Sequence, residues 1–260
     1  MGSFRLTLEY DGTEFAGWQA QPGRRTVQGE VERACRETCG KAVRATAAGR
    51  TDAGVHAAGQ VASVALDWRR GPERLRMALN SRLPEDVAVT ACAEVADGFN
   101  ARRDAVARAY RYAILTRETR SPLLRRCAWW VREPLDIGAM QSAARLFEGR
   151  HDFSAFTTAQ GRARGSRREV ARCRISARGP LILLDVEGNA FLHHMVRIIA
   201  SALVEAGKGR LPAARIRRSL ARLDPEPPAA VAPAPGLALL AVRYRRERRM
   251  PLPAWPPGAA

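Results

Sequence analysis

The sequence predicts an α+β fold made of two ferredoxin-like halves, each with the element order β-α-β-β-α-β. Alternating apolar and polar residues mark strands, helical spacing of apolar residues marks helices, and the same order of elements returns after residue 105. Because two such halves can pair edge to edge, we expect one continuous antiparallel sheet with helices packed on it and a cleft between the halves. With 260 residues, 46% of them hydrophobic, the chain can bury a sizeable core.

The first half covers residues 1–105, and its clearest element is a strand at residues 4–10, where apolar and polar side chains alternate. A helix follows, with Thr26 as its expected N-cap and Gly40 as its stop. The remaining expected elements are strands at 43–48 and 60–66, a helix at 72–83 and a strand at 87–95.

The second half covers residues 106–246 and repeats this order with one insertion. Its expected elements are a strand at 107–115, a helix at 135–148, strands at 171–176 and 181–187, a helix at 189–206, an additional helix at 212–223 and a last strand at 237–244. The basic, glycine-containing segment 160–169 is typical of a mobile surface loop. The tail at 247–260 is basic and then proline-rich, and we expect it to be poorly ordered.

The charge balance indicates a polyanionic partner. Lys and Arg number 43 against 26 Asp and Glu, which gives a formal net charge of +17. A coding bias explains the preference for Arg over Lys, but it does not explain the excess over acidic residues. No apolar run approaches the roughly 20 residues of a membrane-spanning helix, and the N-terminus lacks the apolar core of a signal peptide. We therefore expect a cytoplasmic protein that does not bind membranes.

Metal binding is not expected from the cysteines and histidines. The five cysteines are scattered without a C-x-x-C pair, and the four histidines have no zinc-finger spacing. We expect reduced thiols and no structural or catalytic metal.

The segment Gly49–His56, GRTDAGVH, is the strongest candidate for a catalytic loop. Its two glycines permit backbone geometries that would place Asp52 at the mouth of a cleft. Arg50 would favour the ionised carboxylate, which is the form that acts as a nucleophile or base. The same residues also fit a tight turn in which Asp52 caps a neighbouring N–H.

Two further residues are candidates for the site. Tyr110 and Tyr112 share one face of the strand at 107–115, where an aromatic ring either belongs to the core or stacks on a base. Arg197 lies in the apolar helix at 189–206, on the same side as His193, and its charge either has a partner such as Asp52 or reaches solvent.

These motifs resemble the tRNA pseudouridine synthase A family, also called tRNA pseudouridine synthase I. GRTDAGVHAAGQV resembles the family signature around its nucleophilic aspartate. Ordered matches continue along nearly the whole chain: YDGTEFAGWQ at 10–19, TVQGEVE at 26–32, LNSRLPEDVAV at 79–89, FNAR at 99–102, AYRY at 109–112, DFSAF at 152–156, NAFLHHMVR at 189–197 and GLALLAVRY at 236–244. The stretch after Phe156 has more arginines than the family pattern.

The resemblance implies a role for each matching residue. Asp52 would be the catalytic nucleophile, Arg50 would help to displace the target base, Tyr110 would pack on the uracil, and Arg197 would be the buried partner of the aspartate. The implied reaction converts uridine to pseudouridine at positions 38, 39 and 40 of the tRNA anticodon stem-loop, with base flipping and no cofactor. The family is usually homodimeric.

The loop arginines are a separate hypothesis. We expect Arg162, Arg164, Arg167 and Arg168 to contribute to tRNA binding, because basic side chains neutralise phosphates.

Two other classes of protein share parts of this pattern. A binding-only RNA module with two RRM-like halves would share the element order and charge, but the aromatic RNP1 pattern is missing from the sequence. A metal-dependent nuclease or deaminase would also be basic, yet the sequence lacks clusters of ligands and the H-x-E…P-C-x-x-C signature.

Overall fold

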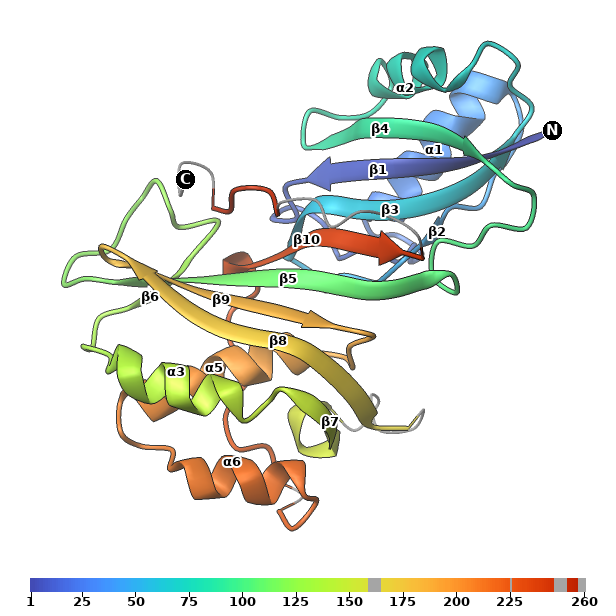
Figure 1. The fold of residues 1–260 in the computed structure, drawn as a ribbon. Helices are drawn as coiled ribbons and strands as arrows, with labels where there is room; N and C mark the ends of the chain where they lie inside the picture. The colour runs from blue at the N-terminus through green and yellow to red at the C-terminus, as the bar shows by residue number, and fades with distance from the viewer. Residues whose placement is uncertain (159–164, 225, 246–251, 257–260) are drawn as a thin grey trace. The chain divides into compact units, whose positions relative to one another are not determined.

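The structure, a computed structural model, describes residues 1–158, 165–224, 226–245 and 252–256. The chain forms two compact units. The first comprises Met1–Val106 and Leu239–Pro253, and the second comprises Ala107–Ala238 and Ala254–Ala260. Both units combine an antiparallel sheet with helices, so the predicted α+β class is confirmed (Figure 1).

The first unit has the strand order of a ferredoxin-like fold. Its elements are β1 (Gly2–Tyr10), α1 (Val27–Cys39), β2 (Thr46–Ala47), β3 (His56–Leu66), α2 (Pro72–Asn80) and β4 (Val87–Val95). The sheet runs β4-β1-β3 with β2 on the far side of β3, and all of these pairs are antiparallel. The strand β10 (Leu237–Tyr244) also lies beside β3, so its residues from Leu239 onward belong to this unit although they come last in the chain.

The core of the first unit follows from the sequence pattern. Phe4, Leu6 and Leu8 point to one face of β1 and are fully buried, as the alternation predicts. The side chain of Thr26 accepts a hydrogen bond from the amide of Gly29 and so caps α1, which ends at Gly40 in a left-handed conformation. Both predicted ends of this helix are confirmed.

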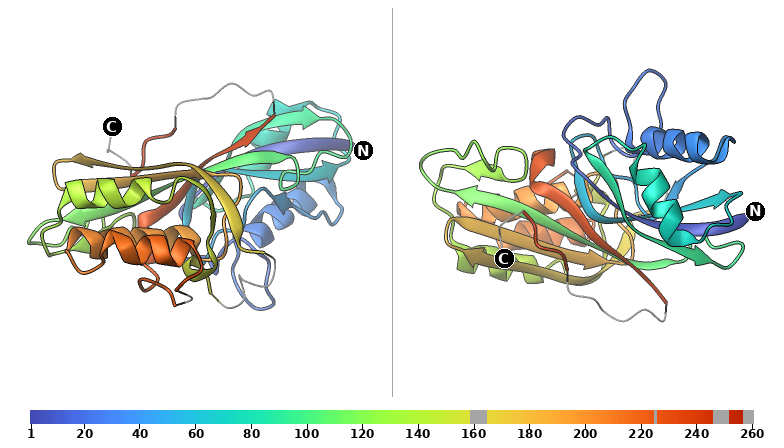
Figure 2. Two further views of the ribbon diagram at one scale, coloured as in Figure 1. Left: turned by 60° about the horizontal axis from the view of Figure 1, so that its bottom comes forward. Right: turned by 90° about the horizontal axis from the view of Figure 1, so that it is seen from above.

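The second unit contains a four-stranded antiparallel sheet in the order β5-β9-β8-β7. Its elements are β5 (Ala105–Thr116), β6 (Trp129–Val131), α3 (Ile137–Arg145), β7 (Gly149–Asp152), the 3-10 turn η1 (Ser154–Phe156), β8 (Arg167–Arg178), β9 (Leu181–Gly188), α5 (Met195–Gly207), α6 (Ala213–Leu220) and the 3-10 turn η2 (Ala234–Gly236). The short strand β6 pairs with β5 in parallel. Figures 1 and 2 show α3 and α5 on the same face of this sheet.

The helix predicted at 189–206 begins later than expected. His194 has a φ of 62°, a left-handed conformation that a right-handed helix cannot contain, so α5 starts at Met195. The expected pairing of His193 with Arg197 on one helix face is therefore wrong. The helix is also buried on nearly all sides, and only Arg197 and Glu205 retain part of their exposure.

Other differences concern short or irregular segments. The strand expected at 43–48 is reduced to β2, whereas β3 begins at His56 and therefore includes the residues directly after the loop. The sequence pattern did not predict β6 or β7. Residues 167–169, expected in a mobile loop, open β8 because Arg167 and Arg168 pair with Asp152 and His151 of β7. Most of the tail expected to be poorly ordered, 247–251 and 257–260, lies outside the described residues.

No helix in the described part of the chain is long and apolar enough to cross a membrane.

Candidate active site

The loop Gly49–Val55 lies between β2 and β3 in the first unit. Thr51 in this loop is hydrogen-bonded through both its side chain and its backbone. The hydroxyl oxygens of Thr51 and Tyr10 are 2.8 Å apart, and the Thr51 carbonyl accepts a hydrogen bond of 3.0 Å from the amide of Trp18. Thr51, Tyr10 and Trp18 are all buried. The middle of the loop is therefore fixed to the first strand and to the segment after it.

A buried amide completes this support. The side chain of Gln60, on β3, donates hydrogen bonds to the hydroxyl of Tyr10 at 3.3 Å and to the carbonyl of Gly49 at 2.7 Å. Burial raises the pKa of Tyr10 to about 12, against smaller effects of the hydrogen bonds with Thr51 and Gln60, so the phenol stays neutral. The neutral hydroxyl accepts from Gln60 and can either donate to or accept from the hydroxyl of Thr51.

Two glycines in the segment that follows β1, Gly12 and Gly17, allow the backbone of that segment to approach the loop closely. A Cβ on Gly12 would lie 2.0 Å from the carbonyl oxygen of Val55. Gly17 has a φ of 92°, and a Cβ there would lie 2.7 Å from the carbonyl oxygen of Thr51. The segment YDGTEFAGW therefore encloses GRTDAGVH at distances that only glycine permits.

His56 is a buried structural residue at the end of the loop. Its Nδ1 lies 3.2 Å from the amide nitrogen of Gly12 and 3.1 Å from a carboxylate oxygen of Asp11. A neutral Nδ1 accepts from Gly12, whereas a protonated Nδ1 donates to Asp11, so one of the two contacts is favoured in either state. His56 thus ties the end of the loop to the segment after β1.

Asp52 and Arg50 are the two charged residues of this loop, and both reach solvent, as do Gly49, Ala53 and Gly54. Asp52 is half-buried and Arg50 is exposed, while Thr51, Val55 and His56 around them are buried. The carbonyl of Asp52 accepts a hydrogen bond of 3.2 Å from the amide of Val55, which closes a tight turn. The turn expected as an alternative is thus present in the backbone, and Asp52 within it is half-buried.

Tyr110 and Arg197 lie in the second unit. The ring of Tyr110, on β5, is 7% exposed and meets Phe191 edge to face, with ring centroids 5.2 Å apart. Arg197, in the first turn of α5, is half-buried, and its Nε donates a hydrogen bond of 2.7 Å to the carbonyl of Ala232. The pairing of Arg197 with Asp52 stays a prediction.

The neighbouring Tyr112 belongs to the core. It is fully buried, and its hydroxyl donates to the carbonyl of Pro233 at 2.7 Å. Burial raises the pKa of Tyr112, and the charge of Arg197 offsets part of this effect. Of the two tyrosines on this strand, Tyr112 therefore has the structural role.

The loop arginines are divided between two regions. Arg162 and Arg164 lie outside the described residues. Arg167 is exposed at the start of β8, whereas Arg168 is half-buried, and burial lowers its pKa.

Sequence reasoning missed the residues that support the site. Tyr10, Thr51 and Gln60 are far apart in the chain and have ordinary strand or loop patterns. In the second unit, Thr157 and Thr158 were missed in the same way: their hydroxyls contact the carbonyl and the Nδ1 of His193 at 2.8 and 2.9 Å. Polar residues on the buried face of a strand were the available signal, and Gln60 is the clearest example.

We predict that Tyr10→Phe destabilises the first unit by roughly 1–3 kcal/mol, because the buried hydroxyl of Thr51 loses its partner. Urea unfolding measures this change. The matched control is Tyr244→Phe, which removes a buried hydroxyl bonded to the carbonyl of Ala101 in the same unit. We expect catalytic activity to fall more in Tyr10→Phe, since only that change loosens the loop of Asp52. Equal losses in the two variants would contradict this support role.

Asp52 thus lies in a loop of an α+β fold that is held by buried contacts. The family profile described as tRNA pseudouridine synthase matches residues 7–102 and 143–245. The chain belongs to the tRNA pseudouridine synthase family, which confirms the resemblance. It is thus a pseudouridine synthase, an isomerase.

Individual relatives match over almost the whole chain. tRNA pseudouridine synthase A of Pelobacter propionicus is 43% identical, over 94% of this chain and 100% of its own length. The proteins of the same name from Moorella thermoacetica and Myxococcus xanthus are each 44% identical over 94% of this chain, and over 100% and 93% of their own lengths. Among solved structures, an archaeal box H/ACA Nop10–Cbf5 complex is similar at a TM-score of 0.36 and 13% identity, over 78% of this chain and 43% of that chain.

Proposed function

We propose that this protein converts uridine to pseudouridine at positions 38, 39 and 40 of the tRNA anticodon stem-loop, with Asp52 as the nucleophile. The observation that carries the proposal is the loop geometry: buried contacts fix Thr51 and Val55, and Asp52 between them is half-buried rather than enclosed in the core. The relatives' shared name, tRNA pseudouridine synthase A, supports tRNA as the substrate.

The reaction rearranges one nucleotide. The N1–C1′ bond breaks, the uracil turns, a C5–C1′ bond forms, the hydrogen on C5 leaves as a proton, and N1 takes up a proton, so the product is an isomer of the substrate. Asp52 in its ionised form starts each of three routes: attack at C1′, attack at C6 of the base, or abstraction of a sugar proton. Because no atoms or electrons are gained from a co-reactant, the reaction needs no cofactor.

The other site residues act on the flipped base. Flipping a stacked base costs a few kcal/mol, which contacts in the site must offset. Arg50 helps to displace the base, the ring of Tyr110 packs on the uracil, and Arg197 is the partner of the Asp52 carboxylate. The burial of Tyr110 and the partial burial of Arg197 support these roles, since both side chains are fixed by contacts within the second unit.

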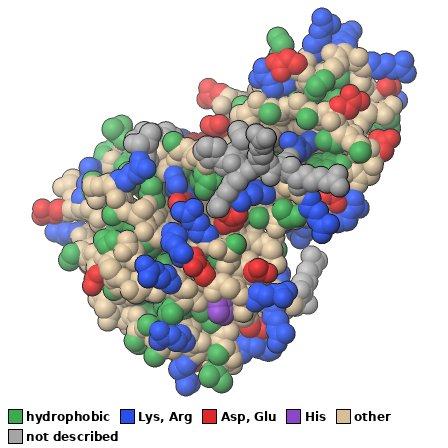
Figure 3. Space-filling model, in the orientation of Figure 1, with side chains coloured by type: hydrophobic (Ala, Val, Ile, Leu, Met, Phe, Trp, Pro, Cys, Tyr) green, Lys and Arg blue, Asp and Glu red, His purple; other side chains and the backbone are tan. Residues whose placement is uncertain are grey.

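The protein acts in the cytoplasm as a homodimer that binds tRNA mainly through arginine. The net charge of +17 supports phosphate binding, and Figure 3 shows Lys and Arg side chains spread over the visible face of the molecule.

We predict that replacing Arg162, Arg164, Arg167 and Arg168 by Gln weakens tRNA binding and lowers the salt slope of log Kd by up to about 4, because each phosphate contact contributes about one. Filter binding at several salt concentrations measures both quantities. The matched control is a variant in which four exposed arginines outside this loop are replaced by Gln: Arg69, Arg70, Arg74 and Arg102. Unchanged affinity and slope in the loop variant would refute a role for the loop.

Release of tritium tests the proposed target. With tRNA transcripts labelled at C5 of uridine, the protein should release tritium in the presence of chelator when uridines occupy positions 38–40. A transcript with cytidine at these three positions and uridine elsewhere should release none. Equal release from both transcripts would contradict the anticodon stem-loop as the target.

A further inference from the structure

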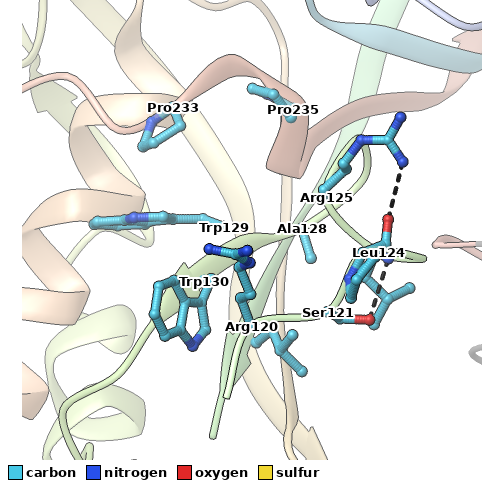
Figure 4. A pocket seen from close by; sticks show the side chains of 11 residues that line it. Arg120, Ser121, Leu124, Arg125, Ala128, Trp129, Trp130, Pro233 and Pro235 are labelled. Atoms are coloured by element: carbon cyan, nitrogen blue, oxygen red, sulfur yellow. Dashed lines mark hydrogen bonds between the residues drawn. The ribbon is translucent and has the colours of Figure 1, made fainter. Parts of the chain in front are cut away.

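The second unit contains a pocket that includes none of the predicted site residues. It lies between the connection from β5 to β6 and the segment around η2, and its volume is about 580 Å³. Ligand sites commonly measure roughly 300–1,000 Å³, so one nucleotide fits by size. In Figure 4, Trp129 and Trp130 lie on one side of the view, Ser121 and Leu124 on the other, and Pro233 and Pro235 above them.

The aromatic wall of the pocket is held in place. The indole nitrogen of Trp130 donates a hydrogen bond of 2.9 Å to the carbonyl of Arg117. Trp129 meets the ring of Tyr112 edge to face at 6.2 Å, and the hydroxyl of Tyr112 donates to the carbonyl of Pro233. The tryptophan wall and the proline wall are thus joined through Tyr112.

The opposite wall is also ordered. Leu124 packs against a buried cluster that includes Leu115 and Ala128, and its carbonyl accepts a hydrogen bond of 2.9 Å from the amide of Ala128. The hydroxyl of Ser121 accepts from the amide of Leu124 at 3.3 Å (Figure 4). The connection between β5 and β6 is therefore a folded segment.

The pocket combines an exposed aromatic face with positive charge. Trp130 is 40% exposed, which is unusual for so large an apolar side chain. Arg120 and Arg125 are exposed at the same pocket, and within the described ranges neither has a carboxylate partner. An indole face stacks on a nucleobase, and a guanidinium without a carboxylate partner binds a phosphate. One nitrogen of the Arg125 guanidinium, Nη1, donates a hydrogen bond of 3.1 Å to the carbonyl of Pro122, which leaves its other N–H groups for a ligand.

We propose that this pocket binds one unpaired nucleotide of the tRNA, with its base stacked on Trp130 and its phosphate at Arg120 and Arg125. The inference rests on the proposed function, since tRNA supplies the nucleotide. Charge favours this occupant over a second copy of the chain, because a two-fold contact would bring the same arginines against each other.

The test compares tRNA binding and turnover in three variants. Trp130→Ala should raise the Kd for unmodified tRNA roughly tenfold, because one stacking contact is lost, and it should raise KM without changing kcat. Trp130→Phe keeps an aromatic face and should restore most of the affinity. Arg120→Gln with Arg125→Gln should weaken binding and lower the salt slope by about 1–2. Arg126→Gln, an exposed neighbour that does not line the pocket, is the matched control.

A direct probe separates the inference from the proposed function. Adenosine 5′-monophosphate should show saturation-transfer NMR signals with the wild type and lose them with Trp130→Ala, whether or not pseudouridine forms. Failure of the wild type to form pseudouridine would instead refute the proposed function. The inference is wrong if Trp130→Ala and the double arginine variant bind tRNA like the wild type. It is equally wrong if Trp130→Ala splits a dimer in sedimentation while the nucleotide signal persists.

Discussion

Replacing Asp52 by Asn should reduce the rate of pseudouridine formation by about 10⁴-fold or more, while tRNA binding stays within about threefold of the wild type. Asparagine has almost the same shape as aspartate, so the loop held by Thr51 and Val55 keeps its conformation. The amide carries no charge and cannot act as the nucleophile or the base. Single-turnover tritium release with excess protein measures the chemical step alone.

The matched control is Asp97→Asn, an exposed aspartate of the same unit that accepts a hydrogen bond from Ser3. It should react at the wild-type rate. A rate for Asp52→Asn within tenfold of the wild type would show that the loop is only a structural turn and that another residue supplies the nucleophile.

Gly12→Ala should destabilise the protein by about 3 kcal/mol and lower activity by about 100-fold in the fraction that folds. The added Cβ would lie 2.0 Å from the carbonyl oxygen and 2.5 Å from the carbonyl carbon of Val55, and backbone atoms cannot rotate away as a side chain can. Either the segment that follows β1 or the loop of Asp52 must therefore move. Urea unfolding and tritium release give the two quantities.

Gly23→Ala is the control for Gly12→Ala. Gly23 has a φ of 68°, and a Cβ there would meet no atom within 4 Å, so this change costs only the strain of a left-handed alanine, about 1–2 kcal/mol. We expect it to leave the rate of the folded protein unchanged. If both variants lose stability and activity equally, close packing of Gly12 on Val55 does not position the loop.

Local patterns were sufficient for most of the regular elements. The alternating residues of β1 are consecutive in the chain, and each cap of α1 lies within a few residues of the group that it bonds, so the sequence displays these features directly. The strands β6 and β7 were missed because they are short and their pairing partners lie elsewhere in the chain. The start of α5 was wrong by six residues because nothing in NAFLHH marks His194 as left-handed; only the folded structure shows it.

The sequence predicted the candidate reactive residues of the site, but it did not predict the buried residues that hold their loop in place. Asp52 and Arg50 stand in an unusual segment that is visible without a structure. The contacts of Tyr10 with Thr51 and of Gln60 with Gly49 span 41 and 11 residues, and no local pattern encodes them. The pocket beside Trp130 likewise combines residues 115–130 with two prolines about 100 positions further along the chain.

Mapping of pseudouridine in a single tRNA tests the central claim most directly. An unmodified transcript with uridine at positions 38–40 is incubated with wild type or Asp52→Asn in the presence of chelator, then labelled with carbodiimide and read by primer extension. We predict stops at positions 38–40 with the wild type and none with Asp52→Asn. Stops with both proteins, or with neither while tRNA remains bound, would contradict an isomerase that depends on Asp52.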